Sequence, residues 1–160
     1  MKEQRGVPRA IVAVVGHDHE ELRRAIADGD DLEKADRDGR TALHHAAIDG
    51  DRDAVAALLQ AGAIVRTSDR SKWTPLHCAA AEHHLGVAEM LISAGADVEA
   101  EDVFGNTPLW RAVFVSRGRG EMIQLLRKYG ADILHSNRSG VSPLSLATTI
   151  ANYDVARWLR

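Results

Sequence analysis

The chain has 160 residues and a formal net charge of −3, and 45% of its residues are hydrophobic, 27% charged and 4% aromatic. This composition fits one soluble globular domain and favours closely packed helices over a β-sandwich, which needs more aromatic and β-branched residues. The small net charge excludes a global basic field that would hold nucleic acid. Residues 1–101 carry 12 Lys and Arg against 19 Asp and Glu, whereas residues 102–160 carry 8 against 4. We therefore expect a partner with a polarised surface.

Cysteine content and the first apolar stretch bear on the compartment. The single cysteine, Cys78, allows no internal disulfide, and nothing indicates an oxidising environment. After the polar residues 2–5, the apolar stretch at 10–15 is only six residues long, which is too short for a membrane span and weak for a signal core. We therefore expect a cytoplasmic protein that makes no membrane contact.

A four-residue motif recurs at spacings of 33, 33 and 35 residues, and each copy follows a polar turn. Repetition at such a period is the signature of a repeat solenoid. Thr or Ser at the start of each copy suits a helix N-cap, and Pro suits the first helical turn, where no backbone N–H is needed. A Gly-Ala step follows the first three copies, and glycine can end a helix with a positive φ. The motifs are Thr41-Ala42-Leu43-His44, Thr74-Pro75-Leu76-His77, Thr107-Pro108-Leu109-Trp110 and Ser142-Pro143-Leu144-Ser145.

These residues resemble the ankyrin repeat over almost the whole chain. The resemblance implies an all-α ankyrin-repeat solenoid of five repeats, built from helix-turn-helix units joined by β-hairpin-like loops. One unit cannot bury its apolar face alone, so the stack of units is the fold. We expect a single domain over residues 1–160, with units at 7–35, 36–68, 69–101, 102–136 and 137–160.

The first unit, over residues 7–35, is degenerate. Val7-Pro8 stands where the later units have Thr-Pro, Gly16-His17 lies between its two helices, and Gly29 marks the exit. In this alignment the unit needs one extra residue to stay in register, and Arg9 takes the position of a core leucine. A polar residue at that position predicts an end cap, whose outer face has no neighbour.

The second to fourth units contain the expected inter-unit contacts. By resemblance, His44 and His77 tie neighbouring units together through hydrogen bonds. The fourth unit has a two-residue insertion at 116–120, whose two glycines predict flexibility and whose two arginines offer a clamp for carboxylates. A tolerated surface insertion is the alternative. The fifth unit ends in a second helix with Arg157 and Arg160, which predicts a polar cap; a chain that continues beyond Arg160 is the alternative.

The resemblance also assigns a binding face. Partners of ankyrin proteins usually lie against the hairpin tips and the first helix of each unit, which together form a concave face. Three of the chain's seven aromatic residues, Trp73, Phe104 and Phe114, fall on positions of this face, and exposed aromatic residues beside arginine are typical of a binding hot spot. The candidate protein-binding residues are Arg37, Arg40, Arg70, Trp73, Val103, Phe104, Asn106, Trp110, Arg111, Phe114 and Arg138.

Two alternatives stay open on this face. Phe114 either contacts the partner or packs under the adjacent loop. Trp110, which with Arg111 replaces the His-Leu of the family's motif, either fills a local gap or widens the apolar patch next to Phe104. We expect Trp73→Ala or Phe104→Ala to lower binding by more than about 2 kcal/mol, as at hot spots, and to change stability little.

No motif predicts catalysis or a cofactor. Adjacent histidines such as His44-His45 and His83-His84 point about 100° apart on a helix, so they do not converge on a metal ion. Cys78 falls in the first-helix core and is expected to be a small buried residue. The acidic stretch from Asp97 to Asp102 is interpreted as the solvated face of a hairpin. We expect no enzyme, no metal and no small-molecule substrate.

Protein binding by a monomer is therefore the leading functional hypothesis. The stretches 105–113 and 142–155 resemble small bacterial ankyrin proteins, some of which resemble immunity proteins. That resemblance implies a cognate toxin, encoded next to this gene, as the partner. The alternative is a general structural or regulatory scaffold, or part of a larger ankyrin assembly, with an unrelated protein partner.

Overall fold

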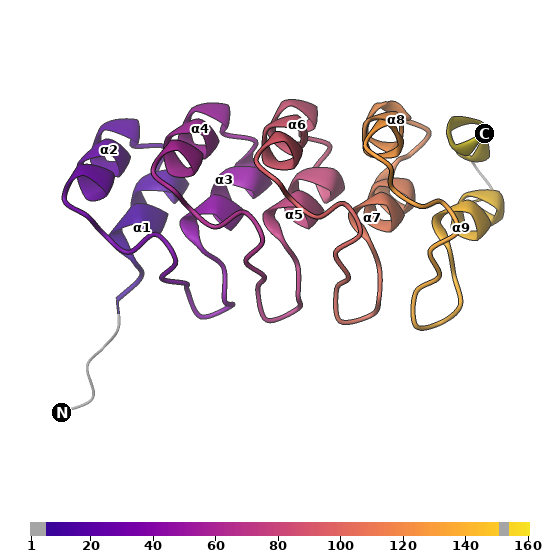
Figure 1. Cartoon of the computed structure of the whole chain (residues 1–160), viewed down its shortest axis with the longest axis horizontal. Helices are drawn as coiled ribbons and strands as arrows, with labels where there is room; N and C mark the ends of the chain where they lie inside the picture. Colours follow the sequence, from indigo (N-terminus) through magenta and orange to yellow (C-terminus); the bar gives the residue numbers. More distant parts are fainter. Residues whose placement is uncertain (1–5, 151–153) are drawn as a thin grey trace.

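Nine α-helices and one 3₁₀ helix follow one another along the residues that the structure describes, 6–150 and 154–160, in a computed structural model (Figure 1). The residues at 2–5 and 151–153, considered above, lie outside the described part. This all-helical architecture confirms the predicted fold class. No helix of the described part is both long and apolar enough to cross a membrane. The elements are α1 (Arg9–Val15), α2 (His19–Ala27), α3 (Ala42–Asp49), α4 (Arg52–Gln60), α5 (Pro75–Ala81), α6 (Leu85–Ser93), α7 (Pro108–Val115), α8 (Glu121–Lys128), α9 (Pro143–Thr149) and η1 (Ala156–Leu159).

The helices form two layers with a row of loops below them (Figure 1). The first helices of the units, α1, α3, α5, α7 and α9, pack side by side in one layer, and the second helices, α2, α4, α6 and α8, pack in the other. The turn η1 continues the second layer, where it contacts α8. Helix α1 and the turn η1 lie at opposite ends of the stack (Figure 1).

One continuous apolar core runs through the stack. The first helices contribute leucines that are at most 1% exposed, Leu43, Leu76 and Leu109, and burying each contributes about 1.5–3 kcal/mol. The alanine pairs 46–47 and 79–80 are fully buried and let adjacent helices approach closely. Cys78 is also buried, and burial raises the pKa of its thiol to about 12, which is typical of an unreactive packing residue.

The predicted histidine ties are confirmed. His44 Nδ1 accepts from the backbone N–H of Thr41, and its Nε2 donates to the carbonyl of Trp73 in the next unit at 3.0 Å. His77 repeats this arrangement with Thr74 and with the carbonyl of Asn106, again at 3.0 Å. Each ring thus caps its own helix and joins two units. Burial lowers the pKa of both rings, in keeping with the neutral form that this bonding requires.

The register predicted for the first unit is wrong by one residue. The helix-to-helix turns place His17, Gly50 and His83 in the left-handed region, with φ of 52°, 70° and 59°, so these residues are equivalent. Pro8 is the N-cap of α1, at the place that Thr41 holds in the next unit, and no extra residue is needed. The extended backbone of Pro8 allows it to precede the helix although it offers no capping side chain.

This shift changes the role of Arg9. The core position of the first unit belongs to Ala10, which is 3% exposed. Arg9 instead lies on the surface, where it forms ion pairs with Glu21 and Asp28 of α2 and the segment after it. The expected polar cap is therefore made by an ion-pair cluster and not by a polar residue at a core position.

The hairpin loops, at residues 36–40, 69–73, 102–106 and 137–141, form a connected row. The first residue of each loop accepts, through its side chain, the backbone N–H groups two and four residues later, as Asp102 does from Phe104 and Asn106. Backbone hydrogen bonds of 2.9–3.0 Å then link each loop to the next, as from the N–H of Arg138 to the carbonyl of Phe104. The loops therefore present their tips in a fixed order.

The insertion at 116–120 supports the C-terminal turn. The indole Nε1 of Trp158 donates to the carbonyl of Gly118 at 3.2 Å. A Cβ at Gly120 would lie 2.1 Å from a ring carbon of Trp158, so only glycine fits there without displacing the ring. These glycines serve a positive φ at Gly118 and a close approach at Gly120 rather than general flexibility.

Candidate functional site

Arg111 and Asp102 form the base of the candidate site. Thr107 caps α7, which begins at Pro108, and this places Arg111 on the helix face toward the preceding loop. Its Nε donates to Asp102 Oδ2 at 3.1 Å, and its Nη2 donates to the same oxygen. The Asp102 side chain is fully buried and that of Arg111 is 17% exposed. Burial raises the pKa of Asp102, but the hydrogen bonds from Arg111 and from the loop backbone outweigh it, so the pKa lies below its ordinary value.

The same guanidinium lies between two indole rings. Arg111 Cζ is 4.8 Å from the ring centroid of Trp73 on one unit and 5.5 Å from that of Trp110 on its own helix. Trp110 stacks on Phe114, with ring centroids 5.3 Å apart and planes inclined by 15°. We call Trp73, Arg111, Trp110 and Phe114 the aromatic stack. Each cation–π contact contributes about 0.5–1 kcal/mol at an exposed site, so the stack is held before any partner binds.

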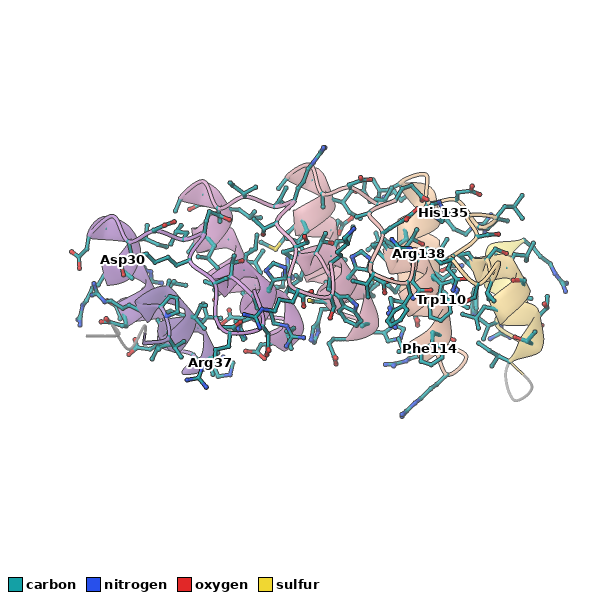
Figure 2. The ribbon with its side chains drawn as sticks, turned by 90° about the horizontal axis from the view of Figure 1, so that it is seen from below. Asp30, Arg37, Trp110, Phe114, His135 and Arg138 are labelled. Carbon is teal, nitrogen blue, oxygen red and sulfur yellow. The ribbon has the colours of Figure 1, made fainter. Side chains whose placement is uncertain are left out.

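Two phenylalanines of this region are exposed to solvent. Phe114, at the end of the aromatic stack, is 58% exposed, and Phe104, at the tip of the loop that Asp102 closes, is 63% exposed. Figure 2 looks onto the hairpin side and shows Trp110 and Phe114 following one another along α7. Asp102 fixes the loop that carries Phe104, and Arg111 fixes the aromatic stack that ends in Phe114. Both phenylalanines therefore lie on ordered parts of the protein.

Trp110 occupies the place at which two other units have the tying histidine. Its indole Nε1 is buried and has no hydrogen-bond partner among the described residues. A buried donor without an acceptor costs about 1–3 kcal/mol. The tryptophan thus does not tie units together as His77 does, and its stacking on Phe114 favours the interpretation that it widens the apolar surface.

The remaining predicted residues separate into exposed and structural ones. Arg37, Arg70 and Arg138 are exposed at the loop tips, and Val103 is half-buried at the equivalent position. Arg40 is half-buried and pairs with Asp69, with its Nε 3.3 Å from Oδ2. In Figure 2, Arg37 lies far along the stack from Trp110, so it does not belong to the same patch.

Two predicted binding residues have structural roles. Asn106 is 4% exposed, donates to Asp102 and accepts from Asn137 at 2.8 Å, so its expected position on the open face is corrected. Trp73 is half-buried and packs against the apolar core, which corrects the expectation that it lies outside that core. Its ring packs on His77, whose imidazole lies 6.1 Å away. Its backbone carbonyl also accepts the hydrogen bond from His44 Nε2.

Asp102 organises the site although it is not among the residues that the sequence predicts to bind a partner. Its place in an acidic stretch predicts a solvated face, yet the side chain is fully buried. A signal was present, because Asp36, Asp69 and Asp102 recur at a spacing of 33 residues. Recurrence at the repeat period indicates a structural role, whereas Glu101 has no such recurrence.

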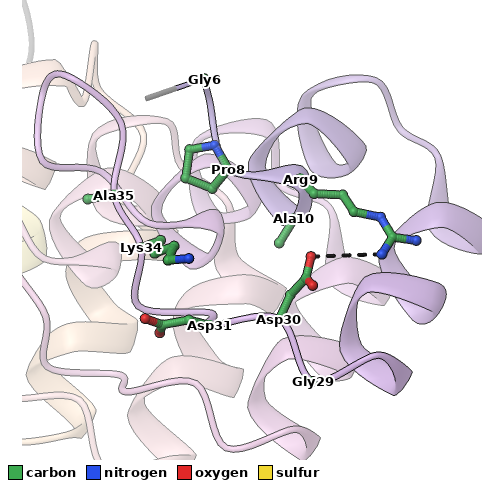
Figure 3. Close-up of a pocket in the computed structure, with 9 residues that line it drawn as sticks. All are labelled: Gly6, Pro8, Arg9, Ala10, Gly29, Asp30, Asp31, Lys34 and Ala35. Atoms are coloured by element: carbon green, nitrogen blue, oxygen red, sulfur yellow. Dashed lines mark ion pairs between the residues drawn. The ribbon is translucent and has the colours of Figure 1, made fainter. Parts of the chain in front are cut away.

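A cavity lies elsewhere, at the N-terminal end (Figure 3). It has a volume of about 970 Å³ and is lined by residues that include Arg9, Asp30 and Lys34. Arg9 and Asp30 form an ion pair of 4.0 Å at its edge (Figure 3). Hydrogen bonds from Arg9 to Glu21 and Asp28 raise the pKa of its guanidinium further. Within the described residues, no group of three or more His, Cys, Asp or Glu side chains is arranged to hold a metal ion.

Comparison with known proteins agrees with the geometry. The family model described as ankyrin repeats (3 copies) matches residues 10–102, and the model described as ankyrin repeat matches residues 104–138. No curated protein matches the chain. Ankyrin repeats generally mediate protein–protein interactions. With more than half of its length matched in this way, the chain belongs to the ankyrin-repeat family.

Proposed function

We propose that this protein is a non-catalytic binding module that holds one protein partner against the aromatic stack and Phe104. The observation that carries the proposal is the exposure of Phe104 and Phe114 on supports fixed by the buried Arg111–Asp102 pair. Exposed aromatic residues in a soluble protein leave water only when another surface covers them. A partner that covers both rings removes their apolar area from water, which favours association by roughly 25 cal/mol per Å² buried.

The rigidity of this surface supports tight binding. Side chains that are already ordered lose little conformational entropy on association, which otherwise costs about 0.5–1.5 kcal/mol for each flexible side chain. Arg111 is held by Asp102 and lies against two indoles, so it keeps its position in the free protein. Binding hot spots are enriched in Trp and Arg, and the aromatic stack contains both.

More narrowly, we propose that the partner is a cognate toxin encoded beside this gene, which the protein neutralises as an immunity protein. It rests on the resemblance of residues 105–113 and 142–155 to small bacterial ankyrin proteins. Co-expression with the neighbouring gene tests it, because an immunity protein restores growth and a general scaffold does not. Growth that stays inhibited would leave the scaffold as the better description.

Site-specific photo-crosslinking tests the broader proposal. A photoreactive amino acid at position 104 is expected to capture one partner in cells, and the same amino acid at position 134 is not. Leu134 is a matched control because it is also 63% exposed but lies on the segment after α8. Capture at 134 with none at 104 would move the interface away from the aromatic stack.

A further inference from the structure

Three arginines at equivalent loop positions have no acidic partner within the described residues. Arg37, Arg70 and Arg138 each follow the first residue of a hairpin loop, and all three are exposed. The ion pairs of the described part use other arginines, such as Arg40 with Asp69 and Arg111 with Asp102. The positive charges at the loop tips are therefore available to a second molecule.

Two of these arginines, Arg70 and Arg138, pack against the loop of the preceding unit. Gly39 and Gly105 have φ of 82° and 76°, and a Cβ on either would approach the stem of Arg70 or Arg138 to 3.3 and 3.2 Å. The backbone N–H of each arginine also donates across the loop boundary, from Arg70 to Asp38 and from Arg138 to Phe104. The aliphatic parts of the Arg70 and Arg138 side chains therefore lie along the row of loops. Their guanidinium groups project from backbone positions that these contacts fix.

The aromatic residues interrupt this row at one place. At the loop position of Arg70 and Arg138, the intervening unit has Val103, followed by the exposed Phe104. From the third to the fifth unit, the loop tips therefore carry a cationic, an apolar and a cationic side chain in turn. A ligand that fits them has an apolar side chain between two carboxylates.

The spacing of the loops limits the form of that ligand. Each loop has two legs, and neighbouring extended segments lie about 4.8 Å apart, so consecutive loops repeat about every 10 Å. A polyproline II-like segment turns once in three residues and advances about 3.1 Å per residue, so every third side chain faces the same way about 9 Å further on. The two spacings agree to within about 1 Å.

We propose that the partner docks through an extended acidic segment in which one apolar residue is flanked, three residues to each side, by carboxylates. The apolar side chain covers Phe104, and the carboxylates pair with Arg70 and Arg138. This inference rests on the proposed binding function and names the chemistry of the partner. Pairs of this kind at an interface rim act on the association rate and on specificity.

Titration with a short synthetic peptide of this pattern, with Asp as the acid and Leu as the apolar residue, tests the proposal. The peptide should bind the full chain about tenfold more tightly than its Asp-to-Asn counterpart, because rim charges favour association. Among the three tryptophan indole N–H signals, those of Trp73 and Trp110 should shift, whereas that of Trp158, bonded to Gly118, should not. The double variant R70Q/R138Q should abolish the preference for the acidic peptide.

The control variant R52Q/K128Q removes the same charge from the second helices α4 and α8 and should keep the preference. Equal affinity for the Asn peptide, or no shift of the Trp73 and Trp110 signals with any peptide, would overturn the inference. Equal affinity for a single-stranded oligonucleotide of the same charge would also overturn it, because the surface would then recognise any polyanion. None of these results changes the expected crosslinking at position 104, which tests the binding function itself.

Discussion

The guanidinium of Arg111 and the carboxylate of Asp102 connect helix α7 to the loop that precedes it. One oxygen of Asp102 accepts a hydrogen bond from Arg111 Nε, while the other accepts hydrogen bonds from the backbone N–H groups of Phe104 and Asn106. The aromatic stack and the tip that carries Phe104 are therefore positioned by the same buried carboxylate. Exposed apolar groups on two different elements become one binding surface through this pair.

Removal of Asp102 should be among the most destabilising single changes outside the apolar core. Asp102→Ala leaves the largely buried Arg111 without its partner and two backbone N–H groups without an acceptor, so we expect a loss of about 3–5 kcal/mol. Asp102→Asn keeps the turn, as Asn137 does in the fifth unit, and should cost at least about 1 kcal/mol less. Urea unfolding measures both. Equal losses would show that the loop acceptor contributes nothing.

Trp110→His should stabilise the protein and weaken binding. The histidine can cap Thr107 and reach the next loop, as His77 does, and the unpartnered indole N–H disappears. We expect a gain of about 1 kcal/mol in the free energy of unfolding, the usual net value of such hydrogen bonds. Binding should weaken because Phe114 loses the ring on which it stacks. A destabilised variant would show that Trp110 is needed for packing.

Gly120→Ala should displace the C-terminal turn. The new Cβ overlaps the Trp158 ring while the backbone, at φ −112°, is unstrained, so the cost of about 1–3 kcal/mol arises from overpacking. When Trp158 is already alanine, the same change should cost less than about 0.5 kcal/mol, because additivity fails for residues in contact. A double-mutant cycle measures this coupling. Additive losses would contradict the contact between Gly120 and Trp158.

Acid should lower the stability of the solenoid because it protonates His44 and His77. Burial lowers the pKa of both from 6.5, so the unfolded chain binds protons at a higher pH than the folded one. The free energy of unfolding is then fully retained above about pH 6.5 and decreases as the pH falls below it. The pKa values of Asp36, Asp51 and Asp102 are also lowered, from 3.8, so their contribution is lost only at a lower pH.

The variant His77→Gln isolates this effect. It should be less stable than the wild type at neutral pH, and the difference should shrink as the pH falls toward 5, since the wild type alone must give up the neutral imidazole. Urea midpoints at several pH values provide the comparison. A difference that is independent of pH would mean that His77 is not bound as a neutral ring.

The sequence predicts the solenoid and its units because every turn, cap and core position recurs in register. It misplaces the first unit by one residue because Pro8 aligns with the proline of the motif, whereas its backbone occupies the N-cap. Asn106 and Asp102 lie at loop positions that look solvated, and only the stacked neighbouring loop buries them. The stacking of Arg111 between Trp73 and Trp110 joins two units and has no local pattern in the sequence.

The affinity of the captured partner for two double variants tests the central claim most directly. Phe104→Ala/Phe114→Ala and Ile64→Ala/Leu134→Ala remove apolar side chains of similar exposure, 63% and 58% in the first pair and 55% and 63% in the second. We predict that the first pair weakens binding by at least about 2 kcal/mol, as hot-spot residues do, while the second changes it by less than about 0.5 kcal/mol. Equal effects, or a larger effect of the second pair, would contradict an interface on the aromatic stack and Phe104.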